Sequence, residues 1–290
     1  LCTYKANKKQ QYGKLSTVSD NTGTPMLARQ RQDFIMDLVT RNGGVRVAEV
    51  VEALGISEMT VRRDITELVS AGLVERVHGG AVAAGPSSME PRFATKSEQH
   101  TNEKRQIALA AAKLVRPQDS LALSGGTTTL AVARALTELE HFPTLTIITN
   151  SLPAANLLFD AADTAREQGH PAPTVILIGG ERTPSAALVG LTGIDALSSL
   201  RVEWSFMGTH AFDARVGLMT PNLSEAATNR ALVRCARTTV AVMDVSKWDA
   251  LGLQCFCSLD DLDVLITDRS PEPQTVAHLE DHGITLTIAD

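Results

Sequence analysis

Aromatic residues and long apolar runs are both scarce in this sequence. Phe, Trp and Tyr make up 4% of the 290 residues, whereas hydrophobic residues make up 43%. Any core must therefore consist mainly of Ala, Val, Leu and Ile. No apolar run approaches the roughly 18 residues that a membrane-spanning helix needs. The polar N-terminus bears lysines and has no apolar stretch typical of a secretory signal. We therefore expect a cytoplasmic protein with no membrane partner.

Cysteine is rare as well. The four cysteines are Cys2, Cys235, Cys255 and Cys257. A single residue separates Cys255 from Cys257, which is the wrong spacing for a zinc knuckle. Few, unpatterned thiols are typical of a reducing compartment. We expect unpaired cysteines, no metal site and no bound cofactor.

A strong positive charge is also missing, because the net charge is −6. Residues 1–80 carry eleven Lys or Arg and nine Asp or Glu, a net of +2, which leaves −8 for the rest. This sign is the one expected if only an N-terminal domain meets DNA. An architectural or RNA-binding protein would need basic stripes or stacking aromatics, and the sequence lacks both.

Composition divides the chain into four parts. Residues 1–25 are polar and without hydrophobic periodicity, so we expect a disordered tail. The chain opens with Leu, and we expect the natural protein to begin at Met26, which an intact-mass measurement checks. Residues 27–83 are expected to form one domain and residues 98–290 another. Residues 84–97 between them, rich in Pro, Ser and Gly, are expected to be a linker.

The pattern of residues 27–83 predicts three helices and a short hairpin. The first helix presents Phe34, Ile35, Leu38 and Val39 on one face, and the second spans 47–54 and is closed by Gly55. The third begins at the N-cap Ser57 and is expected to turn inward the side chains of Met59, Val61, Ile65 and Leu68. The hairpin comprises residues 73–77 and 81–83.

Two short helices joined through Gly55 have the geometry of a winged helix-turn-helix, whose second helix enters the major groove of double-stranded DNA. Arginine suits guanine or phosphate, and threonine suits phosphate or a thymine methyl group. The expected DNA-contacting residues are Ser57, Glu58, Thr60, Arg62 and Arg63 on this helix, and Arg76 and His78 on the wing. The alternative is an ordinary three-helix unit with a solvated arginine face.

Strands and helices alternate beyond residue 98. The expected strands are 120–123, 145–149, 174–178, 202–207, 239–243 and 264–267, and the expected helices include 127–139, 153–165 and 224–236. This order predicts an α/β fold with a parallel sheet and helices on both faces.

A glycine- and threonine-rich turn follows the first of these strands. Its glycines let the backbone approach an anion, while free N–H groups at the helix start and hydroxyl groups can donate to it. The expected phosphate-binding residues are Gly125, Gly126, Thr127, Thr128 and Thr129. The turn matches neither the dinucleotide nor the nucleoside-triphosphate motif. The alternative is a purely structural turn.

Polar groups and glycines also follow the other expected strands, whose carboxyl ends meet at one edge of a parallel sheet. The further expected effector-binding residues are Asn150, Gly179, Gly180, His210, Asp213 and Lys247. A packed core histidine is the alternative for His210, and a solvated loop charge is the alternative for Lys247.

The run GISEMTVRRDITELVSAGLVERVHGGAV, residues 55–82, resembles the signature of the DeoR family of bacterial transcriptional regulators. Downstream, GGTTTL, TNSLPAA, SEAATNRALV, SKW and LITD resemble blocks of that family's sensor domain, so the resemblance covers residues 27–268. It implies that residues 57–68 form the recognition helix. It also implies a Rossmann-like sensor domain similar to ribose-5-phosphate isomerase and glucosamine-6-phosphate deaminase, which senses phosphorylated sugars or related metabolites.

Carried over by this resemblance, residues 126–129 hold phosphate, Asn150, His210 and Asp213 face the sugar, and Lys247 supplies a cation. The sequence departs from the family pattern where Ser124 and Gly125 stand in place of Asp and Ser, and where Glu203 stands in place of Asp. Losing the carboxylate at 124 predicts an effector different from the commonest ones.

The expected function is that of a DNA-binding regulator of carbohydrate metabolism, a repressor rather than an activator. It would act as a homo-oligomer that a phosphorylated metabolite releases from its operator. The alternative is a sugar-phosphate isomerase with an appended DNA-binding domain. Isomerisation needs a placed general base, and Asp213 and His210 are the only obvious candidates, so we do not expect an enzyme.

Overall fold

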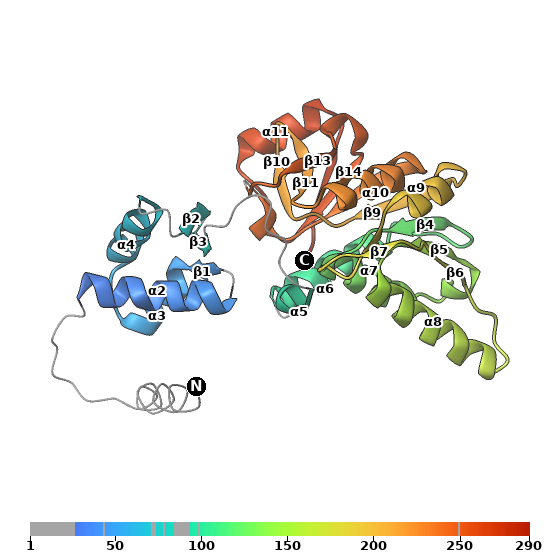
Figure 1. Cartoon of the computed structure of the whole chain (residues 1–290), viewed down its shortest axis with the longest axis horizontal. Coiled ribbons are helices and arrows are strands. Elements are labelled where there is room, and N and C mark those ends of the chain that lie inside the picture. The colour runs from blue at the N-terminus through green and yellow to red at the C-terminus, as the bar shows by residue number, and fades with distance from the viewer. Residues whose placement is uncertain are drawn as a thin grey trace.

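The computed structural model describes residues 27–42, 44–70, 74–77, 79–83, 93–97, 99–248 and 250–290. It contains a small helical domain and a larger α/β domain (Figure 1). The expected tail, the expected wing residue His78 and most of the expected linker lie outside the described residues. Within the part that is described, no helix is long and apolar enough to span a membrane.

The small domain places three helices against a three-stranded antiparallel sheet of order β1-β3-β2. Its elements are α2 (Ala28–Asn42), β1 (Gly44–Arg46), α3 (Val47–Leu54), α4 (Glu58–Ser70), β2 (Val74–Val77) and β3 (Gly80–Ala83). The core is aliphatic, with Ile35 from α2, Val50 from α3, and Val61 and Ile65 from α4 among its buried residues. This architecture is the predicted winged helix-turn-helix.

Local sequence explains the turn between α3 and α4. Gly55 ends α3 in a left-handed conformation, with φ 63°, and its N–H donates to the carbonyl oxygen of Val51, a conformation that glycine adopts without strain. The hydroxyl of Ser57 accepts a hydrogen bond from the backbone N–H of Thr60 at 3.2 Å, which satisfies one of the unpaired donors at the start of α4. Ile56 packs against the core between the two helices.

One expected core residue of this domain is exposed. Val61, Ile65 and Leu68 are buried as predicted, but Met59 is 81% exposed. A helix turns by about 100° per residue, so Met59 lies about 200° from Val61 and cannot share its face. The prediction that Met59 points inward is wrong.

The larger domain is built on a seven-stranded parallel sheet of order β15-β14-β12-β9-β4-β5-β6. Its strands are β4 (Ser120–Leu123), β5 (Thr146–Thr149), β6 (Thr174–Leu177), β9 (Val202–Met207), β12 (Ala236–Val242), β14 (Val264–Thr267) and β15 (Thr285–Ile288). The first six are the predicted strands, with β12 beginning three residues earlier than expected. The seventh, β15, was not predicted.

Helices cover both faces of this sheet, as predicted. They are α5 (Phe93–Ser97), α6 (Thr101–Ala112), α7 (Thr127–Thr137), α8 (Leu152–Glu167), α9 (Leu191–Ser198), α10 (Leu223–Arg234) and α11 (Pro273–Asp281). Successive strand residues point to opposite faces, so Leu121 and Leu123 pack with α6, α7 and α8. Ala122 between them packs with the core that includes α9, α10 and α11.

Short elements complete the domain. Strands β10 (Ala211–Asp213), β11 (Gly217–Thr220) and β13 (Gln254–Cys257) form a small antiparallel sheet, and β7 (Glu181–Arg182) pairs with β8 (Leu188–Val189). Three 3-10 turns span Phe142–Thr144, Val245–Lys247 and Leu259–Asp261. The described end of the expected linker, residues 93–97, forms the short helix α5.

The order of the strands creates a switch point between β4 and β9. From β4 the chain proceeds outward through β5 and β6, and then it returns to β9 on the other side of β4 and continues outward through β12, β14 and β15. In such sheets a crevice opens at the carboxyl ends of the two strands where the direction reverses, and ligands bind there.

Candidate functional site

The expected DNA-contacting residues at the start of α4, on α4 and on β2 lie on the surface. The residues Ser57, Glu58, Arg62, Arg63 and Arg76 are exposed, and Thr60 is half-buried. Both arginines of α4 have a carboxylate one turn away, because Arg62 pairs with Glu58 at 2.6 Å and Arg63 with Glu67 at 3.4 Å. These pairs hold the guanidinium groups along the helix and nearly neutralise the local charge. Glu58 therefore positions Arg62 in the free protein.

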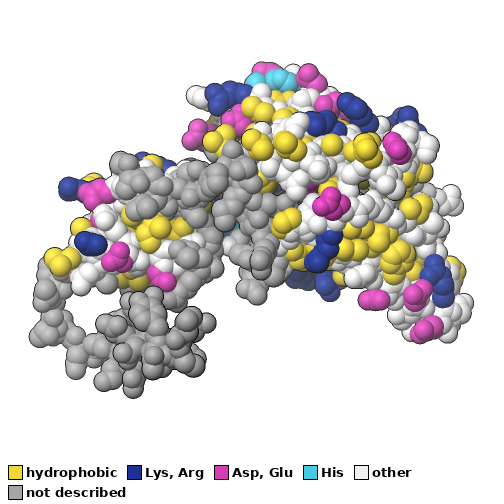
Figure 2. All heavy atoms as spheres, in the orientation of Figure 1, with side chains coloured by type: hydrophobic (Ala, Val, Ile, Leu, Met, Phe, Trp, Pro, Cys, Tyr) yellow, Lys and Arg dark blue, Asp and Glu magenta, His cyan; other side chains and the backbone are white. Residues whose placement is uncertain are grey.

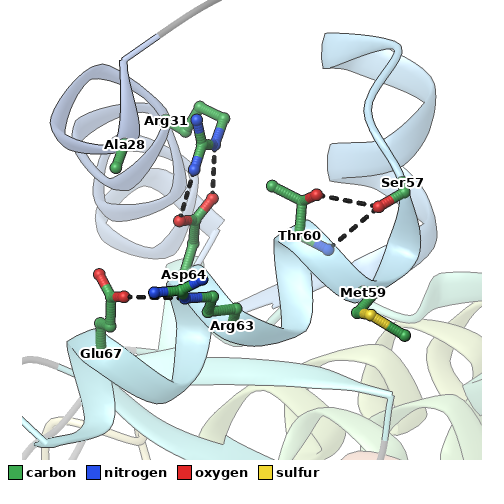
Figure 3. Close-up of a pocket in the computed structure, with 8 residues that line it drawn as sticks. All are labelled: Ala28, Arg31, Ser57, Met59, Thr60, Arg63, Asp64 and Glu67. Carbon is green, nitrogen blue, oxygen red and sulfur yellow. Dashed lines mark hydrogen bonds and ion pairs between the residues drawn. The ribbon is translucent and has the colours of Figure 1, made fainter.

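An ion pair fixes α4 against α2. Arg31 on α2 donates two hydrogen bonds to the carboxylate of Asp64 on α4, at 2.6 and 2.8 Å, and Asp64 is 1% exposed. Figure 3 shows this pair beside the bonded Ser57 and Thr60. The cleft that these residues border has a volume of about 420 Å³ and lies along the exposed side of α4. The helix is thus held rigidly while its outer face stays open.

A second pocket lies at the switch point of the large sheet. It is lined by Phe93, Lys96, Gln99, His100, Lys104, Gly125, Gly126, Thr127, Thr128, Ser185, Gly208, Thr209, His210, Thr220, Pro221, Glu225 and Lys247. Residues 125–128 follow β4 and residues 208–210 follow β9. Ser124 joins the two strand ends, because its hydroxyl accepts a hydrogen bond from the N–H of Gly208 at 2.9 Å.

Steric constraints and backbone conformation explain why residues 125 and 126 of this pocket are glycines. A Cβ atom added to Gly125 would lie 2.5 Å from the Cβ of Ala187, and Gly126 adopts φ 146°, a conformation that side-chain-bearing residues rarely take. Gly126 is the N-cap of α7. The positive end of the α7 dipole and its free N–H groups therefore point at the pocket, which suits an anion.

Lysines reinforce the positive potential. The Nζ atom of Lys104 donates at 2.6 Å to the carbonyl oxygens of Lys96 and Gln99. Burial lowers the pKa of Lys104 to about 8, with Lys247 acting in the same direction and Asp244 and Glu103 opposing it. An anion bound beside Lys104 would favour its charged form.

The histidine expected in the site faces it. Burial, together with the charges of Lys96 and Lys247, lowers the pKa of His210 to about 3. Its imidazole is therefore neutral near pH 7 and can offer a hydrogen bond but is a poor general base. Its buried Nδ1 atom has no hydrogen-bond partner among the described residues, and burying such an atom unpaired costs free energy that a bound ligand can recover.

Five expected effector-binding residues lie outside the pocket wall. They are Thr129, Asn150, Gly179, Gly180 and Asp213. The hydroxyl of Thr129 donates to the carbonyl oxygen of Gly126 at 3.1 Å. The side-chain amide of Asn150 donates to the carbonyl oxygen of Leu188 at 3.0 Å. Asp213 forms an ion pair with Arg215 at 3.1 Å. Gly179 and Gly180 follow β6, which lies at the edge of the sheet, two strands away from the switch point.

Sequence reasoning missed the contribution of α5, α6 and α10. Lys96, His100 and Lys104 approach from the N-terminal side of the domain, and Glu225 comes from the first turn of α10. No motif in the sequence marks these residues. A lysine among the apolar positions of α6 was the one available signal, because Lys104 shares the buried face with Ile107, Ala108 and Ala111.

The described residues hold no metal-binding cluster of three or more His, Cys, Asp or Glu side chains. The three described cysteines are free. On the face shown in Figure 2, positive and negative side chains of the α/β domain are interspersed and form no stripe of one sign.

Comparison with known proteins decides the family. A model described as "DeoR-like helix-turn-helix domain" matches residues 31–86, and one described as "DeoR C terminal sensor domain" matches residues 99–269. The chain belongs to the DeoR family of transcriptional regulators. The family resemblance inferred from the sequence is confirmed, and the protein is a regulator with a DNA-binding and a sensor domain.

Curated relatives of this DeoR-family chain are themselves regulators. The "Glycerol-3-phosphate regulon repressor" of Escherichia coli is 33% identical over 91% of this chain and its own full length. The "HTH-type transcriptional regulator GlpR" of Haloferax volcanii is 33% identical over 90% of this chain and 98% of its own. The "Lactose phosphotransferase system repressor" of Staphylococcus aureus (strain N315) is 35% identical over 85% and 94%. None of these names describes an enzyme.

Among solved structures, ribose 5 phosphate isomerase A from Neisseria gonorrhoeae matches 55% of this DeoR-family chain and 56% of its own, with 14% identity and a TM-score of 0.37. That likeness is distant, so the family assignment depends on the sequence matches.

Proposed function

We propose that this regulator represses genes of carbohydrate metabolism in the cytoplasm, and that a phosphorylated sugar or polyol bound at the switch-point pocket releases it from operator DNA. The relatives support the class of gene, because two of them are named as repressors of glycerol-3-phosphate and lactose-phosphotransferase systems. One recognition helix per half-site requires at least two copies on a repeated operator, so the functional unit is a homo-oligomer.

The observation that carries the effector class is the chemistry of the pocket wall. The glycine-rich start of α7, Lys104 and Lys247 line the same pocket. These groups suit a phosphate, which accepts hydrogen bonds from backbone N–H groups and from ammonium groups. Glu225 and the neutral His210 suit the hydroxyl groups of the sugar or polyol. Asn150, which donates to the carbonyl oxygen of Leu188, and Asp213, which pairs with Arg215, line no part of this pocket.

One part of the pocket wall suggests how binding releases DNA. The five-residue helix α5 contributes Phe93 and Lys96 to that wall. At the start of α5, the backbone N–H of Phe93 donates a hydrogen bond to the carbonyl oxygen of Pro184 at 3.2 Å. Since α5 directly follows the connection to the DNA-binding domain, its displacement alters how that domain is held.

Ligand binding to the full chain tests the effector assignment. Thermal unfolding is measured with glycerol 3-phosphate, a hexose 6-phosphate, a ketohexose 1-phosphate and inorganic phosphate. A ligand that binds only the native state raises the transition temperature by mass action. Thr128→Ala and Lys247→Ala should abolish the rise and leave operator binding intact. Thr137→Ala, at the far end of the same helix, is the matched control and should keep it. A Thr128 variant that responds normally would refute the phosphate assignment.

The rival function, an isomerase with a DNA-binding appendage, has a direct test. Incubation of the full chain with ribose 5-phosphate should give no turnover, because the neutral His210 is a weak base and Asp213 is paired with Arg215 away from the pocket. Formation of ribulose 5-phosphate at a rate proportional to the protein concentration would favour the enzyme.

A further inference from the structure

Among the described residues of the DNA-binding domain, the most exposed large apolar side chain is that of Met59, in the first turn of the proposed recognition helix. It is 81% exposed, whereas the aliphatic residues on the inner face of α4 are 0–4% exposed. Water-exposed apolar surface of this size is unfavourable, and an isolated side chain that stays exposed on a binding helix is available for contact with a ligand.

The surroundings of Met59 argue against a protein-binding patch. Residues three and four positions along a helix share one face, and here these positions are Arg62 and Arg63. Each arginine is held by a glutamate of the same helix. Met59 is therefore a single apolar side chain between two ion pairs, and protein interfaces instead centre on a contiguous apolar core.

The same surroundings fit the major groove of DNA. The first turns of a recognition helix lie against base edges, and the thymine methyl group is the apolar feature among these edges. The bonds of Arg31 with Asp64 and of Ser57 with Thr60 fix this turn in place. In Figure 3 Met59 projects from the first turn of α4, on the same helix as Arg63.

We propose that Met59 reads sequence by packing against a thymine methyl group, so that each operator half-site carries a thymine at one defined position. This inference depends on the proposed operator binding by α4. Arg62 and Arg63 then supply polar contacts on either side, and Met59 supplies the apolar one. Burying one methyl group corresponds to about a four-fold change in affinity.

The test uses the full chain and a library of duplexes with a randomised segment. The wild-type chain selects its preferred duplexes, and the enriched duplex is then synthesised with deoxyuridine in place of each thymine in turn, which removes the methyl group alone. We expect one position per half-site at which this substitution weakens wild-type binding about four-fold.

Three variants complete the test. Met59→Ala should bind the thymine and deoxyuridine duplexes equally, whereas Met59→Leu should keep the preference for thymine. Leu27→Ala is the matched control, because Leu27 is another exposed apolar residue of this domain, 68% exposed at the start of α2, and it should bind like the wild type. Because Met59 is exposed, Met59→Ala should unfold at the wild-type temperature.

The outcomes separate this inference from the proposed function. If the wild-type chain enriches no duplex, sequence-specific binding itself fails, and the inference fails with it. If duplexes are enriched but deoxyuridine is tolerated at every position, or Met59→Ala keeps the preference for thymine, the reading of a methyl group by Met59 is overturned while operator binding stands.

Discussion

The carboxylate of Asp64 in α4 accepts two hydrogen bonds from the guanidinium group of Arg31, from Nε at 2.6 Å and from Nη2 at 2.8 Å. The pair joins residues that are 33 positions apart in the chain and has side-chain exposures of 16% for Arg31 and 2% for Asp64. A bidentate pair of this kind fixes both distance and orientation. The angle at which α4 meets DNA therefore depends on α2.

Breaking this pair should destabilise the DNA-binding domain. Arg31→Met leaves the carboxylate of Asp64 buried without its cation, which costs about 3 kcal/mol of unfolding free energy. Denaturant unfolding of the full chain measures the loss. The double variant Arg31→Met with Asp64→Ala should recover part of the stability, because no unpaired charge remains. Strictly additive effects of the two substitutions would contradict a direct interaction.

The arginines of α4 and the wing should differ in what they contribute to operator binding. Arg63→Ala should weaken binding by roughly 1–3 kcal/mol and relax the preference at one base pair if it reads a guanine. Arg76→Ala, on β2, should weaken binding to all sequences alike and reduce the salt dependence by about one counterion. Titrations of the selected duplex at several salt concentrations measure both. Equal losses on specific and random duplexes for Arg63→Ala would rule out base reading.

Effector binding should depend on pH through Lys104. Its pKa of about 8 means that the ammonium group is present near pH 7 and is lost as pH rises toward 9. A phosphate ligand that requires the charged form should bind about ten-fold more weakly at pH 9 than at pH 7. Calorimetric titration measures this. Lys104→Met should bind weakly and show little pH dependence, while Lys113→Met, an exposed lysine just beyond α6, should behave like the wild type. An unchanged slope in Lys104→Met would exclude Lys104.

The contact between the two domains should contribute to the effect of the effector on operator binding. Arg46, the last residue of β1, donates through Nη2 to Glu103 of α6 at 3.5 Å. The same Nη2 atom lies 3.4 Å from Nδ1 of His100, which lines the effector pocket. Glu103→Gln should lower by about two-fold the factor by which effector weakens operator binding, since exposed pairs contribute about 0.5 kcal/mol. Effector affinity without DNA should stay unchanged. Glu138→Gln, an exposed substitution at the end of α7, is the control. An identical factor in Glu103→Gln and wild type would assign the coupling elsewhere.

Local patterns predicted most of the fold because local chemistry determines most of it. Gly55 and Ser57 act on their own turn of chain, and the alternation of Leu121, Ala122 and Leu123 between two faces needs only the strand period. The buried face of α4 was predictable in the same way, because the helical period places Met59 about 200° from Val61, and the prediction for Met59 did not apply that period.

The pocket was predictable only where it follows from strand ends. Gly125, Gly126 and His210 follow the two strands at the switch point, so sequence order places them there. Lys96 and Lys104 lie on helices that precede the sheet in the chain. The hydrophobic periodicity of a helix does not predict against which part of the sheet it packs. Asp213 lies on β10 in a small antiparallel sheet and pairs with Arg215, so its position does not follow from the order of the parallel strands.

The most direct test of metabolite-controlled DNA binding is a titration of the selected duplex with the full chain, with and without saturating effector, followed by fluorescence anisotropy. The effector should raise the dissociation constant by a factor between about 5 and 150, the usual range of coupling between two sites, and it should leave the constant of Thr128→Ala unchanged. If a phosphorylated ligand binds the wild-type chain with a clear thermal shift and yet leaves the dissociation constant of the duplex unaltered, the pocket does not control DNA binding.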